Sequence, residues 1–437
     1  MVKTYHQALD YIYSFIDYSL TKNLRYSPEK FNLNRMKLFL NYIGNPQQEF
    51  KSIHVTGTKG KGSTSMMLAS VLTEAKFKTG LYTSPHMIEF TERIRIGDKQ
   101  ISHKSIINII NELEPIIKQI PELTTFEITT GMAFKYFADQ KVNFAVVEVG
   151  MGGRFDATNT LNPEISIITA ISHDHTRILG KTLRKIAFEK AGIIKPNVPV
   201  VVAKQKASPK KVIIELAREK KARLVYVPDK YQTESKSYSL AGQSFDIRTD
   251  GRNVLTIQMP LLGDHQIDNA ATAFTCLEEL RTMGYRITNK EIQAGFQKIK
   301  WSGRFEIVNK KPLVIVDGAH NSDSFNKLKT TLQKYLPFHE KIMIFGVSED
   351  KDVFQMLKTM QPILKMLIIT KSDHPRAMEL DLIKEHSEKL GIPSKIIPRM
   401  EDSIGEAYFH SDKETVIIAT GSIFIAGAVK NILKANK

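Results

Sequence analysis

Short runs of apolar and β-branched residues alternate with helical patterns along most of this chain. The runs fall at residues 53–56, 80–83, 144–149, 165–171, 198–203, 224–227 and 255–259. Runs this short suit buried strands, and the segments between them have helical spacing. The alternation therefore predicts an α/β fold with a doubly wound parallel sheet. Residues 1–45 show helical spacing throughout and are expected to form a helical lead-in.

A second alternating series starts after Trp301. Its apolar runs lie at 314–317, 342–345, 366–370, 395–398 and 416–419, again separated by helical patterns. A series of this length matches a small Rossmann-like domain. The junction at 297–303 is the expected boundary, so we predict a larger domain over 1–299 and a smaller C-terminal Rossmann-like domain over 300–437.

The strongest local motif is a glycine-rich loop between the first strand and the next helix. Residues 56–64 read Thr-Gly-Thr-Lys-Gly-Lys-Gly-Ser-Thr. Its three glycines let backbone amides curl around an anion, and the helix N-terminus adds donors at the same point. Lys61 would reach the outer phosphates of a nucleotide, with Ser63 or Thr64 near a metal. The spacing is shorter than that of the usual P-loop, and a glycine turn without a ligand is the alternative. We predict a P-loop-type ATPase domain whose reaction the loop leaves open.

Polar side chains at the carboxyl ends of predicted strands could complete a magnesium–nucleotide site. Ser84, Glu148 and the pair His173 and His175 each follow or end an apolar run. A hydroxyl, a carboxylate and one imidazole beside a phosphate loop suit Mg²⁺. Two alternatives stay open: a zinc hydrolase that uses both histidines, and polar groups that merely cap the strands.

The run Gly-Met-Gly-Gly-Arg-Phe at 150–155 is a second glycine-rich segment. It departs from the dinucleotide-binding fingerprint because Phe155 stands where the third glycine belongs. We expect these glycines to let the backbone approach a ligand closely, with Arg154 and Asp156 exposed at the strand end.

Basic residues exceed acidic ones by a wide margin. The 437 residues include 62 Lys and Arg against 46 Asp and Glu, a net charge of +16. Such an excess favours anionic partners: nucleic acid, membrane headgroups, or phosphorylated and carboxylate-rich small molecules. A nucleic-acid-binding ATPase would need clustered basic residues interleaved with aromatics. Here they are scattered, and their densest run, 204–211, is short.

Cysteine content and hydropathy indicate the compartment. The single cysteine, Cys276, excludes a disulfide framework and a cysteine-based zinc site, and its helix-like surroundings predict a buried thiol. Asp10 and Asp17 interrupt what would be the apolar segment of a signal peptide. The longest uncharged stretch near the C-terminus, 416–429, is too short to span a membrane. We therefore expect a cytoplasmic protein without a membrane partner.

Taken in order, these motifs resemble the folylpolyglutamate synthases and dihydrofolate synthases, members of the Mur-ligase superfamily of ATP-dependent amide-forming enzymes. The resemblance extends over nearly the whole chain. Its most specific stretches are 148–159 (EVGMGGRFDATN) and 171–195 (ISHDHTRILGKTLRKIAFEKAGIIK). Further matches lie at 31–46, 53–63, 83–86, 90–94, 124–127, 263–270, 301–305 and 317–321.

The resemblance implies a ligase that adds L-glutamate to a folate or dihydropteroate carboxylate through an acyl phosphate. ATP would be the co-substrate, with two Mg²⁺ ions, a carbamate on Lys190 and a monovalent cation such as K⁺ as candidate cofactors. The implied partners are small molecules, without nucleic acid, and the chain would act as a monomer. Two alternatives remain: a Mur-type ligase acting on a cell-wall precursor, and the basic nucleic-acid-binding ATPase considered above.

The resemblance also implies roles for particular residues. Nucleotide binding would fall to Gly60, Lys61, Gly62, Ser63, Asn269, Arg304 and Asp317. Metal ions would be held by Ser84, Glu148, His175 and Lys190, the last as a carbamate. The pterin substrate would lie against Thr124, Thr125, Phe126, Glu127, Phe155, Asp156 and Ala157. Catalysis would depend on Lys61, Lys190, His320 and Ser422.

The role predicted for one residue rests on the resemblance alone, and several other residues depart from the family's pattern. Without the resemblance, Lys190 reads as a surface lysine. Lys59 stands where the family commonly has Asn and adds a positive charge beside the phosphates. Ser302 stands where Pro is frequent, and Ala428 and Lys430 replace a more polar tail. The position of the glutamate is therefore the least constrained part of the predicted site.

Overall fold

The computed structural model describes residues 1–16, 32–249, 251–372 and 374–435. The predicted helical lead-in appears as α1 (Tyr5–Tyr13) and α2 (Asn34–Tyr42), followed by a 3₁₀ turn, η1 (Pro46–Gln48). The part of that prediction between 17 and 31 lies outside the described residues.

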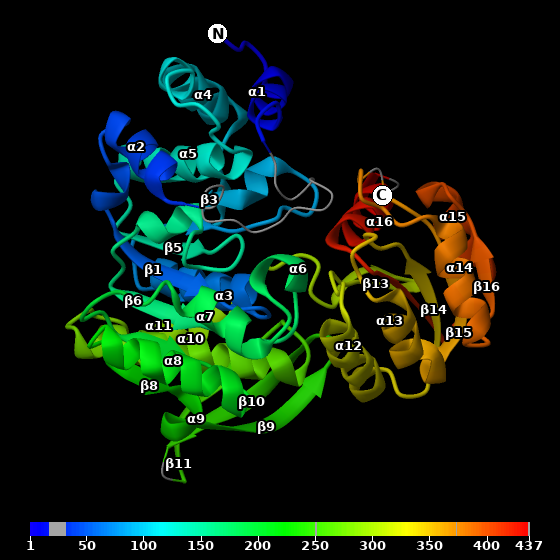
Figure 1. The fold of residues 1–437 in the computed structure, drawn as a ribbon. Coiled ribbons are helices and arrows are strands. Elements are labelled where there is room, and N and C mark those ends of the chain that lie inside the picture. The colour runs from blue at the N-terminus through cyan, green and yellow to red at the C-terminus, as the bar shows by residue number, and fades with distance from the viewer. Residues whose placement is uncertain (17–31, 250, 373, 436–437) are drawn as a thin grey trace.

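An eight-stranded sheet forms the centre of the larger lobe (Figure 1), with strand order β4-β3-β2-β5-β1-β6-β7-β8. Neighbours from β2 to β8 pair in parallel, which confirms the predicted parallel sheet. The hairpin β3–β4 at one edge pairs antiparallel and was not predicted. The strands are β1 (Lys51–Thr56), β2 (Thr79–Tyr82), β3 (Ile94–Ile96), β4 (Lys99–Gln100), β5 (Phe144–Glu148), β6 (Ile165–Ile168), β7 (Val200–Val202) and β8 (Leu224–Tyr226).

Helices cover both faces of this sheet because its central strands are apolar on both sides. In β5, Phe144 and Val146 enter one core and Ala145 and Val147 the other, as expected where successive side chains alternate in direction. The first core is closed by α3 (Lys61–Glu74), α10 (Asp264–Thr282) and α11 (Asn289–Gln297), and the second by α1, α2, α4 (His103–Ile117) and α5 (Thr125–Asp139). A third core lies under α6 (Thr176–Leu179), α7 (Leu183–Ala191) and α8 (Ala207–Glu219). Short turns complete the lobe: η2 (Phe90–Arg93), η3 (Ala157–Thr160) and α9 (Val227–Lys230).

The strand predicted at 255–259 does not continue the parallel series. It lies in β11 (Arg252–Met259), which pairs antiparallel with β10 (Gly242–Thr249), and β10 pairs antiparallel with β9 (Gln232–Ser239). Only two residues join β9 to β10, and a parallel connection needs a crossover of a dozen or more. The prediction was wrong because apolar content alone does not show strand direction.

The smaller lobe is built on a six-stranded sheet of order β12-β13-β17-β14-β15-β16, parallel except for the edge strand β12. Its strands are β12 (Glu306–Lys310), β13 (Leu313–Val316), β14 (Glu340–Phe345), β15 (Leu364–Ile369), β16 (Ser394–Ile396) and β17 (Thr415–Thr420). One face is covered by α12 (Ser322–Tyr335), α13 (Val353–Met360) and α14 (Leu380–Lys389), with η4 (Gln361–Ile363) following α13. The other face is covered by α15 (Met400–Phe409) and α16 (Ile423–Ala435). The predicted Rossmann-like α/β unit is confirmed in its architecture.

The two lobes lie side by side, with α12 on the side of the smaller lobe that faces the larger one (Figure 1). Two contacts of α12 hold this arrangement: Lys334 Nζ lies 2.6 Å from Asp264 Oδ1, and the Tyr335 hydroxyl donates to Gln243 Oε1 over 2.9 Å. The exact domain division at 299/300 stays a prediction. Within the described ranges, no helix is both long and apolar enough to cross a membrane.

Candidate active site

A cavity of about 330 Å³ lies where the two lobes meet. Its walls come from the loops that follow β1, β5, β6, β13 and β17, so the carboxyl ends of strands from both parallel sheets open into one space. All thirteen residues predicted to bind nucleotide or metal, or to act in catalysis, line this cavity: Gly60, Lys61, Gly62, Ser63, Ser84, Glu148, His175, Lys190, Asn269, Arg304, Asp317, His320 and Ser422. A larger surface depression of about 820 Å³ beside α7 and α8 contains none of them.

The glycine-rich loop has a backbone that requires glycine. Gly60 lies just before α3 with φ +88°, in the left-handed region. A Cβ at this position would lie 2.1 Å from Asn269 Oδ1 on α10, so any side chain would displace that amide. The Trp301 ring packs against Gly62 from the junction between the lobes, and its buried indole nitrogen has no hydrogen-bond partner in the described chain. Residues distant in sequence thus close around the loop.

Glu148 and Lys61 face each other across the cavity floor. Lys61 Nζ lies 3.8 Å from Glu148 Oε1, and the Ser84 amide donates to Glu148 Oε2 over 3.3 Å. Burial raises the pKa of Glu148, while the Lys61 ammonium acts in the opposite direction. A buried carboxylate of this kind is a site where a further cation would be stabilised.

Lys190 is buried beneath the phosphate loop, which corrects the reading of this residue as a surface lysine. Its Nζ donates to the Gly57 carbonyl over 2.8 Å, and the residue is 4% exposed. Burial, and then the charge of Lys61, lower the pKa of Lys190 to about 7. An amine with such a pKa is about half uncharged near neutral pH, and the uncharged form is a nucleophile.

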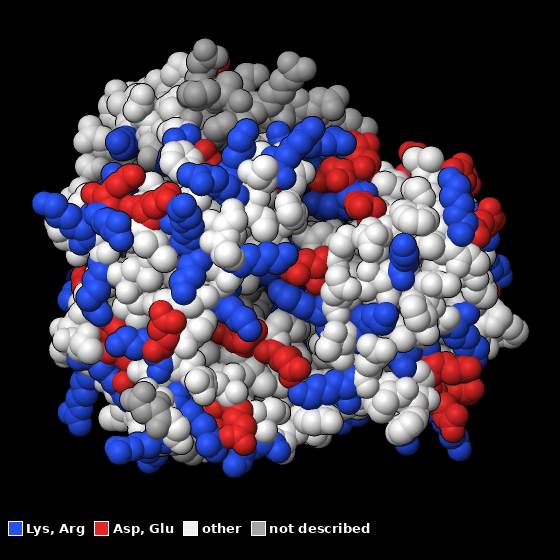
Figure 2. Space-filling view, turned by 60° about the horizontal axis from the view of Figure 1, so that its bottom comes forward, with Lys and Arg blue, Asp and Glu red and all other residues white. Residues whose placement is uncertain are grey.

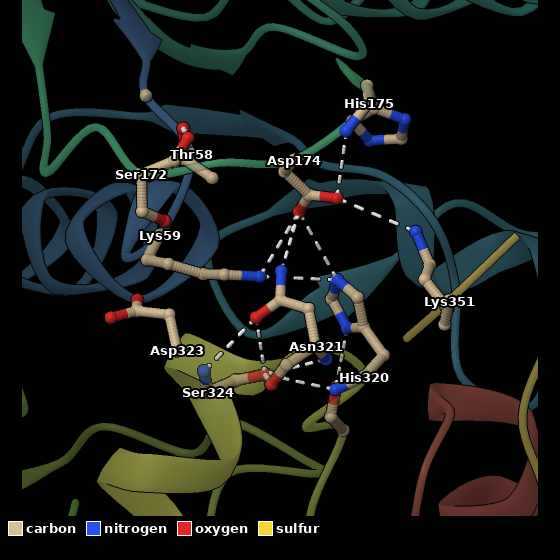
Figure 3. Close-up of polar contacts among 12 residues, drawn as sticks. Thr58, Lys59, Ser172, Asp174, His175, His320, Asn321, Asp323, Ser324 and Lys351 are labelled. Atoms are coloured by element: carbon tan, nitrogen blue, oxygen red, sulfur yellow. Dashed lines mark hydrogen bonds and ion pairs between the residues drawn. The ribbon is translucent and has the colours of Figure 1, made fainter. Parts of the chain in front are cut away.

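Asp174 is the centre of a polar cluster that sequence reasoning missed (Figure 3). Its carboxylate accepts from Lys59 Nζ over 3.2 Å and from Asn321 Nδ2 over 3.0 Å, and Lys351 Nζ lies 3.5 Å away. Burial alone would raise the pKa of Asp174, but the Lys59 ammonium and His320 hold it far below its usual range. Asn321 and Lys351 belong to the smaller lobe, so this one carboxylate joins both lobes at the cavity.

The two histidines that were predicted to end a strand lie several residues beyond the end of β6. β6 ends at Ile168, so His173 and His175 lie in the loop beyond it and not at its last residue. His175 has φ +48° and precedes the short helix α6, and both histidines are exposed. Among the described residues, no group of three or more His, Cys, Asp or Glu side chains is arranged to hold a metal ion. The zinc-hydrolase alternative therefore gains no support from these histidines.

The smaller lobe contributes side chains that its own backbone fixes in place. Asp317 accepts from the Phe305 and Ala319 amides, each over 2.8 Å, and burial raises its pKa despite the nearby Arg304. Ser422 Oγ accepts from the Ile425 amide over 3.1 Å, within the first turn of α16. These side chains are oriented before any ligand arrives.

Two departures from the family's pattern contact each other. Lys430 Nζ donates to Ser302 Oγ and to Glu306 Oε1, each over 2.7 Å. Glu306 in turn accepts from the Gly303 amide over 2.9 Å. The C-terminal helix α16 is thereby tied to the loop that carries Arg304.

The predicted pterin-side residues do not line the cavity, and several have structural partners. Thr124 caps α5: its hydroxyl accepts from the Glu127 amide, and its own backbone amide donates to Glu127 Oε2, which forms a capping box. Glu127 Oε1 lies 3.4 Å from Arg35 Nε, and the Thr125 hydroxyl donates to the Ile12 carbonyl over 3.1 Å. The Phe126 ring packs on Gly150, which does line the cavity. Of this first group, Phe126 comes nearest to the role that the prediction gave it.

The second group of predicted pterin-side residues surrounds Asp156. This residue was expected to be exposed but is buried, because its carboxylate accepts from the Met151 amide over 2.9 Å and from Thr158. The Arg154 guanidinium lies 4.4 Å from the centre of the Phe155 ring, and Ala157 is buried at the start of η3. Asp156 therefore holds the shape of the glycine-rich turn.

The fold and the site together define a class of enzyme. A parallel sheet presents a phosphate loop, and a second α/β unit brings Arg304, Asp317 and His320 to the same cavity. The profile of the family described as Mur ligase middle domain matches residues 55–277, and that described as Mur ligase, glutamate ligase domain matches residues 303–423. The chain is an ATP-dependent ligase of the Mur type, which forms C–N bonds.

Similar proteins narrow the class to a family. The dihydrofolate synthase/folylpolyglutamate synthase of Bacillus subtilis is 33% identical over 411 residues, covering 92% of this chain and 95% of that protein. The structure of Mycobacterium tuberculosis folylpolyglutamate synthase complexed with ADP has 30% identity and a TM-score of 0.89 over 98% of this chain and 99% of the other. E. coli FolC in complex with DHPP and ADP has 26% identity and a TM-score of 0.87 over 100% and 99%. The chain belongs to the folylpolyglutamate synthase and dihydrofolate synthase family.

Proposed function

We propose that this ligase adds L-glutamate to the carboxylate of dihydropteroate or of a reduced folate. The observation that carries the proposal is the cavity between the lobes, where a phosphate loop meets Arg304, His320 and Ser422. The names of its relatives support the same substrates. ATP is the co-substrate.

In the first step the substrate carboxylate attacks the γ-phosphorus of ATP, and an acyl phosphate and ADP result. Little covalent chemistry is required of the protein, so positioning and charge neutralisation carry the rate. Lys61 and Arg304 would offset the charge on the transferring group, while Asn269 and Asp317 would contact the nucleotide from opposite lobes. Closure of the lobes on ATP is therefore part of the cycle.

Mg²⁺ would be held by Ser84, Glu148, His175 and a carbamate on Lys190, and it would neutralise charge on the phosphates. The buried Glu148 carboxylate fits this role, since burial without a metal already disfavours its charge. Lys190 fits as well, because an uncharged amine is the form that adds CO₂. Native mass spectrometry should show the mass of one added CO₂ in the wild type and not in Lys190→Met. K⁺ stays a prediction without an assigned position.

In the second step the amino group of L-glutamate attacks the acyl carbon. A C–N bond forms, the C–O bond to phosphate breaks, and inorganic phosphate leaves. The attacking amine must first lose a proton, and His320 would accept it. Ser422, at the first turn of α16, would orient a carboxylate beside the helix N-terminus.

The test is phosphate release with ATP and L-glutamate, offering dihydropteroate and tetrahydrofolate in separate assays. We expect glutamate-dependent release with at least one, and at least a hundredfold loss in Lys61→Met, since charge at the transferred group is essential. Release with only one acceptor would define a single activity. Absence of release with both would overturn the proposal, and release with a cell-wall precursor would favour the sibling Mur-type ligase.

The distribution of charge gives no support to the nucleic-acid-binding alternative. Figure 2 shows Lys and Arg interspersed with Asp and Glu over the face in view, without one continuous basic stripe. Interspersed charges reduce the local potential that a polyanion would need. We further propose that the enzyme acts as a monomer in the cytoplasm. Sedimentation and cell fractionation would test these two statements.

A further inference from the structure

Lys59, in the phosphate loop, is held by two acceptors from different lobes (Figure 3). Its Nζ lies 3.2 Å from Asp174 Oδ2 and 3.3 Å from His320 Nε2. Asp174 follows β6 in the larger lobe, and His320 follows β13 in the smaller one. The two acceptor atoms are 3.6 Å apart. We call this pair of acceptors, Asp174 Oδ2 and His320 Nε2, the ammonium seat.

The hydrogen bonds of His320 define which of its nitrogens can accept. Nδ1 lies 2.9 Å from the Gly318 carbonyl oxygen, which can only accept, so Nδ1 carries the proton. In the neutral ring, Nε2 then holds a lone pair directed at Lys59. The nearby Lys59 ammonium, together with burial, lowers the pKa of His320, which favours this neutral form. The seat therefore combines a carboxylate with a free base.

Charge balance within the cluster leaves Lys59 as the exchangeable cation. Lys351 has its own partner, since its Nζ lies 2.9 Å from Asp350 Oδ2 and 3.5 Å from Asp174 Oδ1. Asn321 donates to Asp174 without adding charge. If Lys59 leaves, the Asp174 carboxylate keeps its neutral donor and lacks its main counter-ion. An ammonium group from elsewhere would then satisfy it.

The seat opens into the cavity where phosphoryl transfer takes place. Lys59, Asp174 and His320 line the same 330 Å³ as Lys61 and Ser63 of the phosphate loop. Lys59 itself belongs to that loop, so phosphates bound there attract its ammonium away from the seat. Burial lowers the pKa of Lys59 to about 8 despite the Asp174 carboxylate, so burial disfavours the charged form of Lys59 more than the carboxylate favours it.

We infer that the ammonium seat binds the α-ammonium group of the incoming amino acid, and that Lys59 fills it until ATP arrives. This rests on the proposed function and adds Asp174 and the displacement of Lys59 to it. The ammonium gives one proton to His320 Nε2, and its nitrogen lone pair then forms the C–N bond as phosphate leaves. The departing phosphate takes a second proton from the nitrogen. Because ATP must first attract Lys59, the amino acid binds after ATP.

The test is the KM for L-glutamate at saturating ATP and acceptor. Asp174→Asn keeps the shape of the side chain but removes the charge, so KM should rise about tenfold or more. Lys59→Met removes the internal competitor, so in the absence of ATP this variant should bind L-glutamate severalfold more tightly than the wild type, as titration calorimetry would measure. Lys59→Arg retains a cation and should not tighten this binding. A Lys59→Met variant that binds L-glutamate no more tightly than the wild type in the absence of ATP would overturn the inference.

A matched control separates the seat from lobe contacts in general. Asp264→Asn removes a different contact between the lobes, the exposed pair with Lys334, and touches no residue of the seat. Its KM for L-glutamate should equal that of the wild type. A rise equal to that of Asp174→Asn would mean that loosening the lobes explains both results, and the seat would be rejected.

Hydroxylamine separates failure of the seat from failure of the proposed function. It is uncharged at neutral pH and traps an acyl phosphate as a hydroxamate, so it does not need a carboxylate partner. Asp174→Asn should lose far more glutamate transfer than hydroxamate formation. Equal losses would overturn the seat while leaving the ligase reaction intact. A wild type that forms neither product would instead contradict the proposed function.

Discussion

At the scale of single residues, burial determines which polar groups can act. His54 illustrates this within β1, where it is fully buried and its Nε2 lies 2.9 Å from Thr158 Oγ1. The Thr158 hydroxyl donates to Asp156, so it must accept from His54, whose proton is then on Nε2. Burial, with a smaller effect of Lys195, lowers the pKa of His54 to about 3. This neutral histidine donates to Thr158, and Thr158 in turn donates to the buried Asp156.

His54 predicts a specific loss of stability in acid. In the unfolded chain it binds a proton below about pH 6.5, its ordinary value, whereas in the folded protein it does so only near pH 3. The free energy of unfolding should therefore fall as pH drops through this window, by up to about 1.4 kcal/mol per pH unit. Urea unfolding at pH 7, 6, 5 and 4 should show a shallower decline for His54→Gln.

The control is His6→Gln, which changes an exposed histidine on α1. Its decline should match that of the wild type. Parallel curves for His54→Gln and the wild type would show that His54 is protonated in the folded state, contrary to this account.

At the scale of elements, two helices begin with the same capping box in different surroundings. In α5 the box joins buried Thr124 and Glu127, and in α11 it joins exposed Thr288 to Glu291. Both satisfy amides at the helix start that would otherwise lack partners. In α5 the first turn also carries Phe126, so the cap fixes a ring that packs on the cavity wall.

Thr124→Ala and Thr288→Ala should each lower the free energy of unfolding by about 1 kcal/mol, since both lose the same cap. Only Thr124→Ala should also raise the KM for the pterin acceptor, because Phe126 shifts with the first turn of α5. Urea unfolding and acceptor titrations would measure the two effects. An equal KM change in both variants would show that the cap of α5 has no local role at the site.

The sequence predicted helices and strands correctly where the apolar pattern matches the faces that are buried in the structure. The parallel strands could be predicted because both of their faces are buried, which requires continuous apolar runs. The sheet β9–β11 could not, since all eight residues of β9 are exposed and show no apolar alternation. Lys190 and Asp174 were hidden for a different reason. Their roles depend on which distant loops meet them, and neither spacing nor composition encodes that meeting.

At the scale of the whole molecule, one loop joins the lobes and holds several site residues. Trp301 packs on the phosphate loop, Arg304 lines the cavity, and Glu306 is tied to α16 through Lys430. The position of Arg304 therefore depends on a contact made by the last helix. If Arg304 contacts the nucleotide as proposed, Lys430 would influence nucleotide binding although it does not line the cavity.

Lys430→Met should raise the KM for ATP about tenfold, because it frees the loop that carries Arg304 from α16, while global stability changes little. Lys395→Met is a suitable control, since it removes the exposed ion pair with Glu406 in the same lobe. Steady-state kinetics at varied ATP would measure both variants. An unchanged KM in Lys430→Met would show that the loop keeps its position without the C-terminal helix.

The position of Trp301 makes its intrinsic fluorescence a probe of the site. It is the single tryptophan among 437 residues, with its ring against Gly62 and the Arg95 guanidinium 5.8 Å from the ring centre. Its emission arises from one position, at the point where loop and lobes converge. Stopped-flow fluorescence should therefore follow nucleotide arrival, and the closure of the lobes proposed above, in real time, without a dye and without altering the chain.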